Sequence, residues 1–118
     1  MTATEALELA RAYVALSNAH RVDLIGPMFA TDAVYRSSAV GEYRGAQAII
    51  EMMRSFFERF PDVFWLCDNY QCSQNRVGFE FQLQATEADS GQSISRGGHE
   101  CIEFDSAGLI RLIEVQAA

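Results

Sequence analysis

The chain contains no lysine, so its nine basic residues are all arginines. Without lysine, Schiff-base catalysis and a lysine general base are excluded. Sixteen acidic residues bring the net charge to -7, and no basic stripe is present that could neutralise phosphate groups. The sequence therefore predicts no nucleic-acid partner.

Long hydrophobic runs are also absent, although 49% of the residues are hydrophobic. No apolar run approaches the roughly 20 residues that a membrane span needs, and the amino terminus lacks a basic segment followed by an apolar block. We therefore expect a cytoplasmic protein with no membrane partner. The 118 residues are enough for one hydrophobic core, which predicts a single domain over residues 1–118.

Cysteine and histidine are scarce, with three and two residues in the chain. An odd number of cysteines without a secretion signal argues against a disulfide framework. The two histidines, His20 and His99, lie far apart, and no cysteine has a histidine at zinc-ligand spacing. We expect no metal and no cofactor, and we interpret the cysteines as small hydrophobic fillers.

The amino-terminal segment has the pattern of a helix with one apolar face. A capping box formed by Thr2 and Glu5 predicts its start. The buried face contains a single phenol, that of Tyr13, among mostly apolar residues at helical spacing: Ala6, Leu9, Ala10, Tyr13, Leu16 and Ser17. A buried phenol needs a polar partner, and a pocket can provide one.

Two further helices are expected before the strands begin. A short one is predicted over Val22 to Phe29, with Pro27 inside it, and the chain should become extended at Ala33. The next should begin after Gly45 and end at Phe60, because Pro61 cannot extend it. From residue 63 onward the alternation becomes strand-like, with segments near 63–72, 76–86, 94–104 and 109–116. Helices followed by an antiparallel sheet predict an α+β domain.

Four motifs resemble one known family in their order and spacing. They are YVxxxNA from Tyr13, DxLxxxFAxDA over Asp23 to Ala33, the sequence Tyr43-Arg44-Gly45 that opens the third helix, and FDxxGxI over Phe104 to Ile110. The chain is thereby similar to the nuclear-transport-factor-2-like superfamily, in particular its SnoaL-like and ketosteroid-isomerase-like members. The resemblance implies a cone-shaped α+β barrel, cystatin-like in architecture. Three N-terminal helices would pack on a strongly curved, mostly antiparallel sheet and leave a cavity.

The same resemblance implies roles for three residues. In steroid-isomerase-like relatives a tyrosine and a protonated acid donate hydrogen bonds to an enolate oxygen, and an aspartate moves the proton. The matching positions hold Tyr13, Glu100 and Ser37, respectively. A serine cannot act unaided as a base, so steroid isomerisation is not expected here. Glu100 is then the predicted acid–base residue, with Tyr13 as oxyanion donor.

Period-two alternation points Glu100 inward independently of the resemblance. Glu100 shares a strand face with Ile102 and Phe104, and burial there would raise its pKa above the usual value of about 4.3. An alternative stays open, in which the carboxyl and the Tyr13 phenol only hydrogen-bond each other inside a filled core. His99 would face outward, unless a bulge at the two preceding glycines reverses the alternation.

A cavity wall is predicted from aromatic and aliphatic side chains together with one serine: Tyr35, Ser37, Phe56, Phe60, Trp65, Phe79, Phe81, Ile102 and Ile113. Such a wall suits a small apolar or aromatic ligand. For Tyr35 and Trp65, aromatic packing is the competing interpretation. Arg36 and Arg44 are expected either to pair with nearby carboxylates or to meet an anionic substrate.

The last predicted strand is apolar on both faces, with Leu109, Ile113 and Val115 on one and Ile110 and Leu112 on the other. Helices can cover only one face, so we predict a homodimer through the sheet. The alternative is that the chain ends fold back over the second face.

The sequence as a whole predicts a small-molecule-pocket protein of the SnoaL-like type. Its expected activity is a cofactor-free acid–base isomerisation or cyclisation of an apolar carbonyl compound. The competing class is a non-catalytic ligand-binding or protein-interaction module on the same fold, which Ser37 favours.

Overall fold

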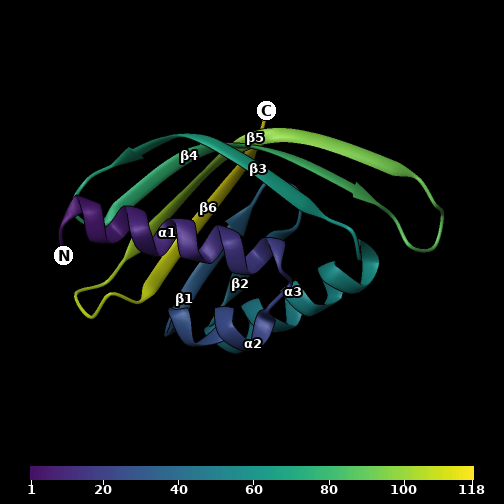
Figure 1. Ribbon diagram of the computed structural model, residues 1–118. Coiled ribbons are helices and arrows are strands. Elements are labelled where there is room, and N and C mark those ends of the chain that lie inside the picture. Colours follow the sequence, from purple (N-terminus) through teal and green to yellow (C-terminus); the bar gives the residue numbers. More distant parts are fainter.

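The computed structural model describes residues 1–118 as helices followed by strands that form one sheet (Figure 1). The helical elements are α1 (Ala3–Asn18), α2 (Val22–Ile25), the 3-10 turn η1 (Gly26–Met28) and α3 (Ala46–Arg59). The strands are β1 (Phe29–Ser37), β2 (Gly41–Arg44), β3 (Phe64–Cys72), β4 (Arg76–Thr86), β5 (Ser93–Phe104) and β6 (Ile110–Ala117). The predicted α+β class is confirmed.

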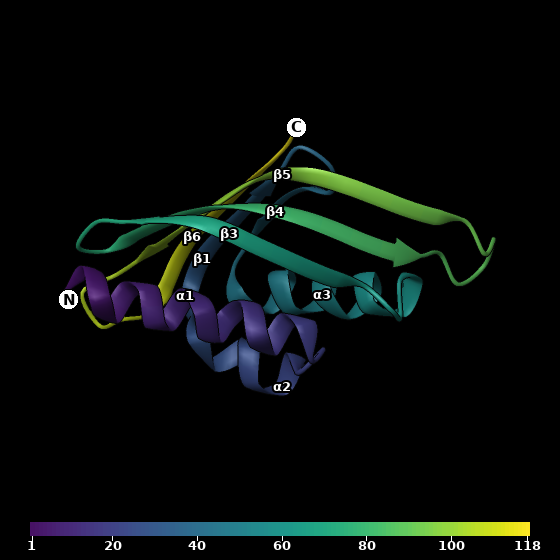
Figure 2. The same ribbon diagram turned by 45° about the horizontal axis from the view of Figure 1, so that its top comes forward.

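The six strands lie in the order β2-β1-β6-β5-β4-β3. Only β1 and β6 run parallel, and all other neighbours are antiparallel. The sheet arches over the helices, and its outer face has no helix on it (Figure 2). α1 packs on β3 and β4, whereas α3 packs on β1 and β2. The face toward the helices is called the inner face below.

Two of the predicted helices are confirmed. α1 begins with the expected capping box, in which Thr2 Oγ1 accepts from the Glu5 backbone and Glu5 accepts from the Thr2 backbone. This exchange satisfies two of the backbone donors that the first turn leaves free. α3 ends at Arg59, because Pro61 disfavours helical geometry at Phe60.

The prediction for the second helix was wrong in its length. α2 ends at Ile25, and Pro27 lies in the 3-10 turn that follows rather than inside the helix. Proline lacks the backbone donor that an α-helix would need at this position, so the tighter turn replaces it. The first strand consequently begins at Phe29, four residues before the predicted start at Ala33.

A short strand, β2, was not predicted. Tyr43 and Arg44 belong to it and pair with β1, so they do not open the third helix as expected. Only Gly45 holds that position, with φ 93° at the start of α3. Glycine adopts this left-handed conformation without the steric cost that other residues meet.

The face assignment of the last strand was wrong for one residue. Phe104 pairs with Ile110 but Glu103 pairs with Leu112, so Arg111 is an extra residue in β6. This bulge returns Ile110 to the inner face, where it is fully buried. Leu112 is then the only apolar residue that β6 presents on its outer face, and the strand no longer requires extensive apolar cover on both sides.

The hydrophobic core fills the space between the helices and the inner face of the sheet. Its largest fully buried side chains are Phe79, Phe104, Ile25, Ile49, Ile102, Ile110, Ile113, Val63 and Val77. None of the helices combines the length and the apolar composition that crossing a bilayer requires.

Candidate active site

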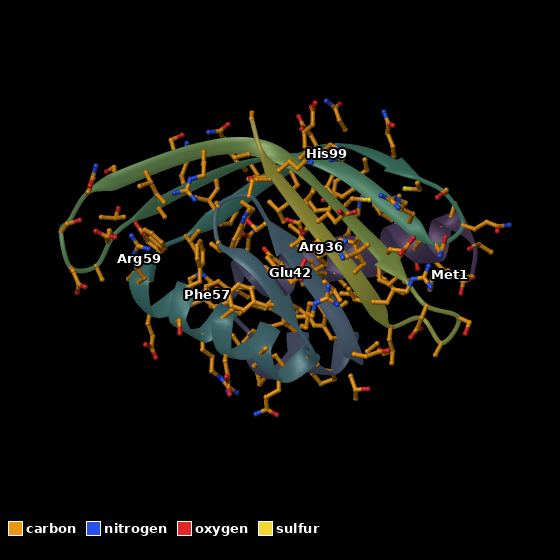
Figure 3. All side chains as sticks on the ribbon, turned by 180° about the vertical axis from the view of Figure 1, so that it is seen from behind. Met1, Arg36, Glu42, Phe57, Arg59 and His99 are labelled. Carbon is orange, nitrogen blue, oxygen red and sulfur yellow. The ribbon has the colours of Figure 1, made fainter.

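Glu100 lies on the inner face of β5 and is 7% exposed. The pairing of β4 with β5 is continuous from Arg76–Glu103 to Thr86–Ser93, so no bulge interrupts the alternation. His99 therefore points to the outer side and is exposed, as Figure 3 shows. The inward position predicted for Glu100 from the sequence pattern is confirmed.

Tyr13 approaches the same region from the opposite layer. It lies on the buried face of α1, is 5% exposed, and packs edge-on against Phe29 with ring centroids 6.1 Å apart. Tyr13 lies on the same face of α1 as Ala6 and Ala10, because residues three or four positions apart share one face of a helix. The two alanines are small and allow α1 to approach the sheet closely.

A cavity of about 80 Å³ lies between α1, α3 and the inner face of the sheet. Sixteen of its 21 lining residues are hydrophobic. The polar members are Glu100, Arg96, Ser17, Ser37 and Ser38, and the tyrosines Tyr13 and Tyr35 add two phenols. The volume is well below the roughly 300 Å³ at which ordinary ligand pockets begin, so only a small molecule fits without movement of the wall.

Burial controls the protonation of the two central groups. It raises the pKa of Glu100 to about 8, and no hydrogen bond from the protein offsets this rise. For Tyr13, burial is the largest cause of a strongly raised pKa, followed by the neighbouring charge of Glu100. At neutral pH both side chains are therefore mainly protonated and able to donate a hydrogen bond.

No hydrogen bond joins the Glu100 carboxyl to the Tyr13 hydroxyl. Both groups line the cavity, and no buried side-chain nitrogen or oxygen of the protein is left without a hydrogen-bond partner. The alternative of a filled core in which the two groups satisfy each other is therefore wrong. A carbonyl oxygen inside the cavity would meet the Glu100 carboxyl and the Tyr13 hydroxyl, which do not bond to each other.

Most of the predicted wall residues line this cavity together with the two central groups: Tyr35, Ser37, Phe56, Trp65, Phe79 and Phe81. The prediction was wrong for three others, which do not line it. Ile102 and Ile113 face each other across β5 and β6 and are fully buried in the core. Phe60 packs in a separate cluster with Val63 and Leu83. Alternation identifies the inward side chains, but only the packing decides which of them border empty space.

Other cavity residues were not recognised in the sequence: Val14, Ser17, Met52, Met53, Phe57, Cys67, Leu83, Arg96, Val115 and Ala117, with the loop residues 38–40. For Arg96 a signal was present, because it lies four residues before Glu100 and alternation places both on one face. Cys67 alternates with the exposed Leu66 on β3. Its position in the wall follows from the same rule.

One end of the cavity is an aromatic patch formed by Phe56, Phe57 and Trp65. Phe56 stacks on Trp65 with centroids 6.0 Å apart, and Phe57 meets Trp65 edge-on at 6.2 Å. Phe57 also stacks on His20 at 4.3 Å and lies between α3 and the sheet in Figure 3. Trp65 therefore both packs against other rings and shapes the cavity.

Ser37 does not behave as a proton-transfer group. Its Oγ accepts hydrogen bonds from the backbone of Ala39 at 3.1 Å and of Val40 at 3.3 Å, so it stabilises the turn between β1 and β2. Glu100 is then the only carboxyl group in the cavity. Any acid–base reaction there depends on this single residue.

Arg36 and Arg44 pair with carboxylates and do not reach the cavity. Arg36 Nε lies 2.8 Å from Glu42 Oε1 on the neighbouring strand, and Arg44 Nε lies 3.0 Å from Glu42 Oε2. Figure 3 shows Arg36 beside Glu42. Histidine, cysteine and acidic side chains nowhere cluster in a way that could hold a metal ion.

Comparison with known proteins gives the fold relatives of this chain. The model of the SnoaL-like domain matches residues 10–113. A protein from Jannaschia sp. CCS1 with the provisional name of a SnoaL-like polyketide cyclase is 13% identical, with a TM-score of 0.87 over 98% of this chain and 87% of that one. A protein of unknown function with a cystatin-like fold from Methylobium petroleophilum PM1 is 23% identical, with a TM-score of 0.82 over 100% and 78%.

A third similar structure is that of SalBIII, an epoxide hydrolase/cyclase-like enzyme in pyran ring formation in the polyether salinomycin. It is 17% identical, with a TM-score of 0.86 over 98% of this chain and 92% of that one. No curated protein is similar enough to the chain to be matched to it. At these identities the likeness shows the fold alone.

Proposed function

The chain belongs to the SnoaL-like domain family, and from this premise we propose that it is an enzyme for cofactor-free acid–base chemistry on a small apolar carbonyl compound. The reaction that we propose is an isomerisation or a cyclisation. Glu100 is the acid–base residue and Tyr13 the oxyanion donor. The observation that carries the proposal is that both side chains line one cavity without bonding to each other.

The proposed reaction begins with the ionised form of Glu100. With a pKa of about 8, about one molecule in ten carries the carboxylate at pH 7. The carboxylate removes a proton from the carbon next to the substrate carbonyl, and the electron pair moves to the carbonyl oxygen. Tyr13 donates a hydrogen bond to the enolate that forms. Glu100 then returns the proton at another carbon, which completes an isomerisation without any cofactor.

The surroundings of Glu100 support this role. An apolar wall strengthens the hydrogen bond from Tyr13, because little water competes for the oxygen. Tyr35 also lines the cavity, and burial raises its pKa strongly, so its phenol stays protonated and offers a second donor. A base with a pKa near the working pH is both sufficiently basic and sufficiently ionised.

Hydrogen exchange at carbon tests the proposal directly. Small ketones and aldehydes are incubated with the protein in deuterated buffer, and deuterium uptake next to the carbonyl is followed by NMR. We expect uptake with the natural protein, none above background with Glu100→Gln, and a loss on the order of a hundredfold with Tyr13→Phe. Trp65 is the only tryptophan and lines the cavity, so its fluorescence shows whether each variant still binds the ligand.

A second candidate function is a non-catalytic binding module on the same fold. The observation that favours it is that Ser37, which the family resemblance aligns with the steroid-isomerase base, is engaged in a turn. Equal binding to the natural protein and to Glu100→Gln, with no exchange in either, would support the binding module and contradict the enzyme.

We also propose that the chain forms a homodimer through the outer face of the sheet. Phe64 and Leu66 on β3 are 48% and 59% exposed and alternate with the cavity residues Trp65 and Cys67. Exposed apolar side chains of this size mark interaction sites, because a second subunit that covers them removes apolar surface from water and stabilises the dimer. Sedimentation should show a dimer that dissociates in Leu66→Glu, and a monomer at micromolar concentration of the natural protein would contradict the proposal.

A further inference from the structure

Arg96 is the only positively charged side chain in the cavity wall. It lies on the inner face of β5 and is half-buried. Gly98, two residues after Arg96 on β5, pairs with Ala117 on β6, and the Ala117 backbone N–H donates to Ser38 Oγ. The exposed lining residues Ser38, Ala39 and Ala117 gather at this end of the cavity. Arg96 therefore stands at the cavity mouth.

No carboxylate neutralises Arg96, in contrast to most arginines of the chain. Six of the nine arginines form ion pairs with acidic residues: Arg21, Arg36, Arg44, Arg59, Arg76 and Arg111. A seventh, Arg11, lies over the ring of Tyr70 at 5.1 Å. Of the remaining two, Arg54 is exposed on α3, whereas Arg96 borders the cavity. Although the chain has sixteen acidic residues, none of them forms an ion pair with the Arg96 guanidinium, which lies where a ligand enters the cavity.

The inner face of β5 carries two polar groups with an apolar surface between them. Arg96 and Glu100 are four residues apart, which is about 13 Å along a strand. Gly98 lies between them on the same face and has no side chain, and the ring of Phe81 packs over it. A ligand along this face would meet a cation at the mouth, an aromatic surface, and then Glu100 and Tyr13.

We propose that the ligand is a small carboxylic acid with a carbonyl group and an apolar body, whose carboxylate binds Arg96 at the cavity mouth. The inference rests on the proposed function and adds the substrate class to it. A guanidinium holds a carboxylate with two parallel hydrogen bonds and stays charged at every accessible pH. A protein of net charge -7 repels anions in general, so an unpaired cation at the mouth is the feature that admits one.

The size of the cavity agrees with this arrangement. A volume of about 80 Å³ accommodates the carbonyl and a short apolar body, while the carboxylate remains at the mouth, in contact with water. A carboxylate taken deep into the apolar part would lose its hydration without a partner, because Arg96 is the only cation there. The ligand is therefore oriented with its carbonyl toward Tyr13 and Glu100.

Matched pairs of probes test the inference. Levulinate and β-benzoylpropionate are each compared with their neutral methyl esters, and binding is measured by the fluorescence of Trp65. The proteins are the natural chain, Arg96→Gln, Arg96→Lys and, as the control, Arg54→Gln, which removes the same charge from the exposed face of α3. We expect at least one acid to bind the natural protein roughly 10- to 100-fold more tightly than its ester, the effect of one charge-assisted contact.

The preference for the acid should disappear in Arg96→Gln, survive in part in Arg96→Lys, and stay unchanged in Arg54→Gln. If both acids bind no more tightly than their esters, or if Arg54→Gln weakens acid binding as much as Arg96→Gln, the inference is overturned. Deuterium exchange next to the carbonyl distinguishes a failure of the carboxylate site from a failure of the proposed enzyme activity. Exchange that depends on Glu100 without any preference for acids would leave the enzyme proposal standing. An acid preference that depends on Arg96 without exchange would leave the carboxylate site standing and contradict the enzyme.

Discussion

The side-chain amide of Asn18 pairs with both backbone groups of Trp65. Its Nδ2 donates to the Trp65 carbonyl oxygen at 2.9 Å, and its Oδ1 accepts from the Trp65 backbone N–H at 2.8 Å. The last residue of α1 thereby continues the hydrogen bonding of the edge strand β3. This contact fixes α1, which carries Tyr13, relative to the strand that supplies Trp65 and Cys67 to the cavity wall.

Asn18→Ala should lower the free energy of unfolding by about 2 kcal/mol, because two partly buried backbone groups of Trp65 lose their partners. Urea denaturation measures the loss, and the fluorescence of Trp65 should change in the folded variant. Asn75→Ala is the control, since the Asn75 side chain makes a single hydrogen bond, to the Phe104 carbonyl. An equal loss in both variants would contradict the special role of the Asn18 pair.

Glu100 should make the stability of the protein depend on pH. Its pKa is about 8 in the folded protein and near 4.5 without burial. Between these values the unfolded chain releases a proton that the folded chain keeps, so the free energy of unfolding falls as pH rises, by up to about 1.4 kcal/mol per pH unit. This contribution is complete below pH 4.5 and is lost by the time the pH has risen through 8.

Glu100→Gln should remove this dependence, which is measured as the difference in unfolding free energy between the variant and the natural protein from about pH 5 to 8. The difference should move in favour of the glutamine variant as the pH rises. Glu58→Gln is the control, because Glu58 is exposed on α3. Parallel pH profiles of Glu100→Gln and the natural protein would show that the carboxyl is not buried in solution.

The proposed reaction should accelerate with pH. Because the ionised form of Glu100 removes the proton, the rate of deuterium exchange should rise about tenfold per pH unit and level off above pH 8, where the carboxyl is ionised. Tyr13→Phe should lower the rate at every pH without moving the midpoint far. A rate that instead decreases above pH 8 would assign the protonated carboxyl as the active form.

Gly98→Ala should be strongly destabilising, whereas Gly97→Ala should not. A Cβ at Gly98 would lie 2.7 Å from Phe81 Cζ and would overlap the carbonyl oxygen of Gln116. The tightest contact of a Cβ at Gly97 would be the side-chain oxygen of Gln82 at 3.0 Å, which can move aside, and the Phe81 carbonyl oxygen lies at an ordinary 3.8 Å. Thermal unfolding of both variants measures the contrast, and a loss of several degrees confined to Gly98→Ala is expected. Equal melting temperatures would contradict the close packing of β5 against β6.

Local patterns in the sequence predicted the long elements well. The capping box at Thr2 and Pro61 after the third helix are signals that act within a few residues, and they fixed the start of α1 and the end of α3. Strand-like patterns between turn residues predicted β3, β4, β5 and β6. β2 was missed because four residues, Gly41–Arg44, are too few for alternation to be recognised, and its pairing with β1 stabilises it.

The candidate site was predictable in part for the same reason. Alternation carried Glu100 inward and the helical stripe carried Tyr13 inward, since both depend on spacing along one element. The bulge at Arg111 could not be seen, because register belongs to a pair of strands. Whether Ile102 borders the cavity or the core depends on how the curved sheet meets the helices.

The sequence by itself determined the order of the long elements, the family resemblance and the inward direction of Tyr13 and Glu100, because periodicity and turn residues act locally. The tertiary structure decided that Tyr13 and Glu100 share a cavity without bonding, that Ile110 is buried, and that Arg96 has no carboxylate partner. Each of these results depends on distances between residues far apart in the chain, which are set when the sheet curves over the helices.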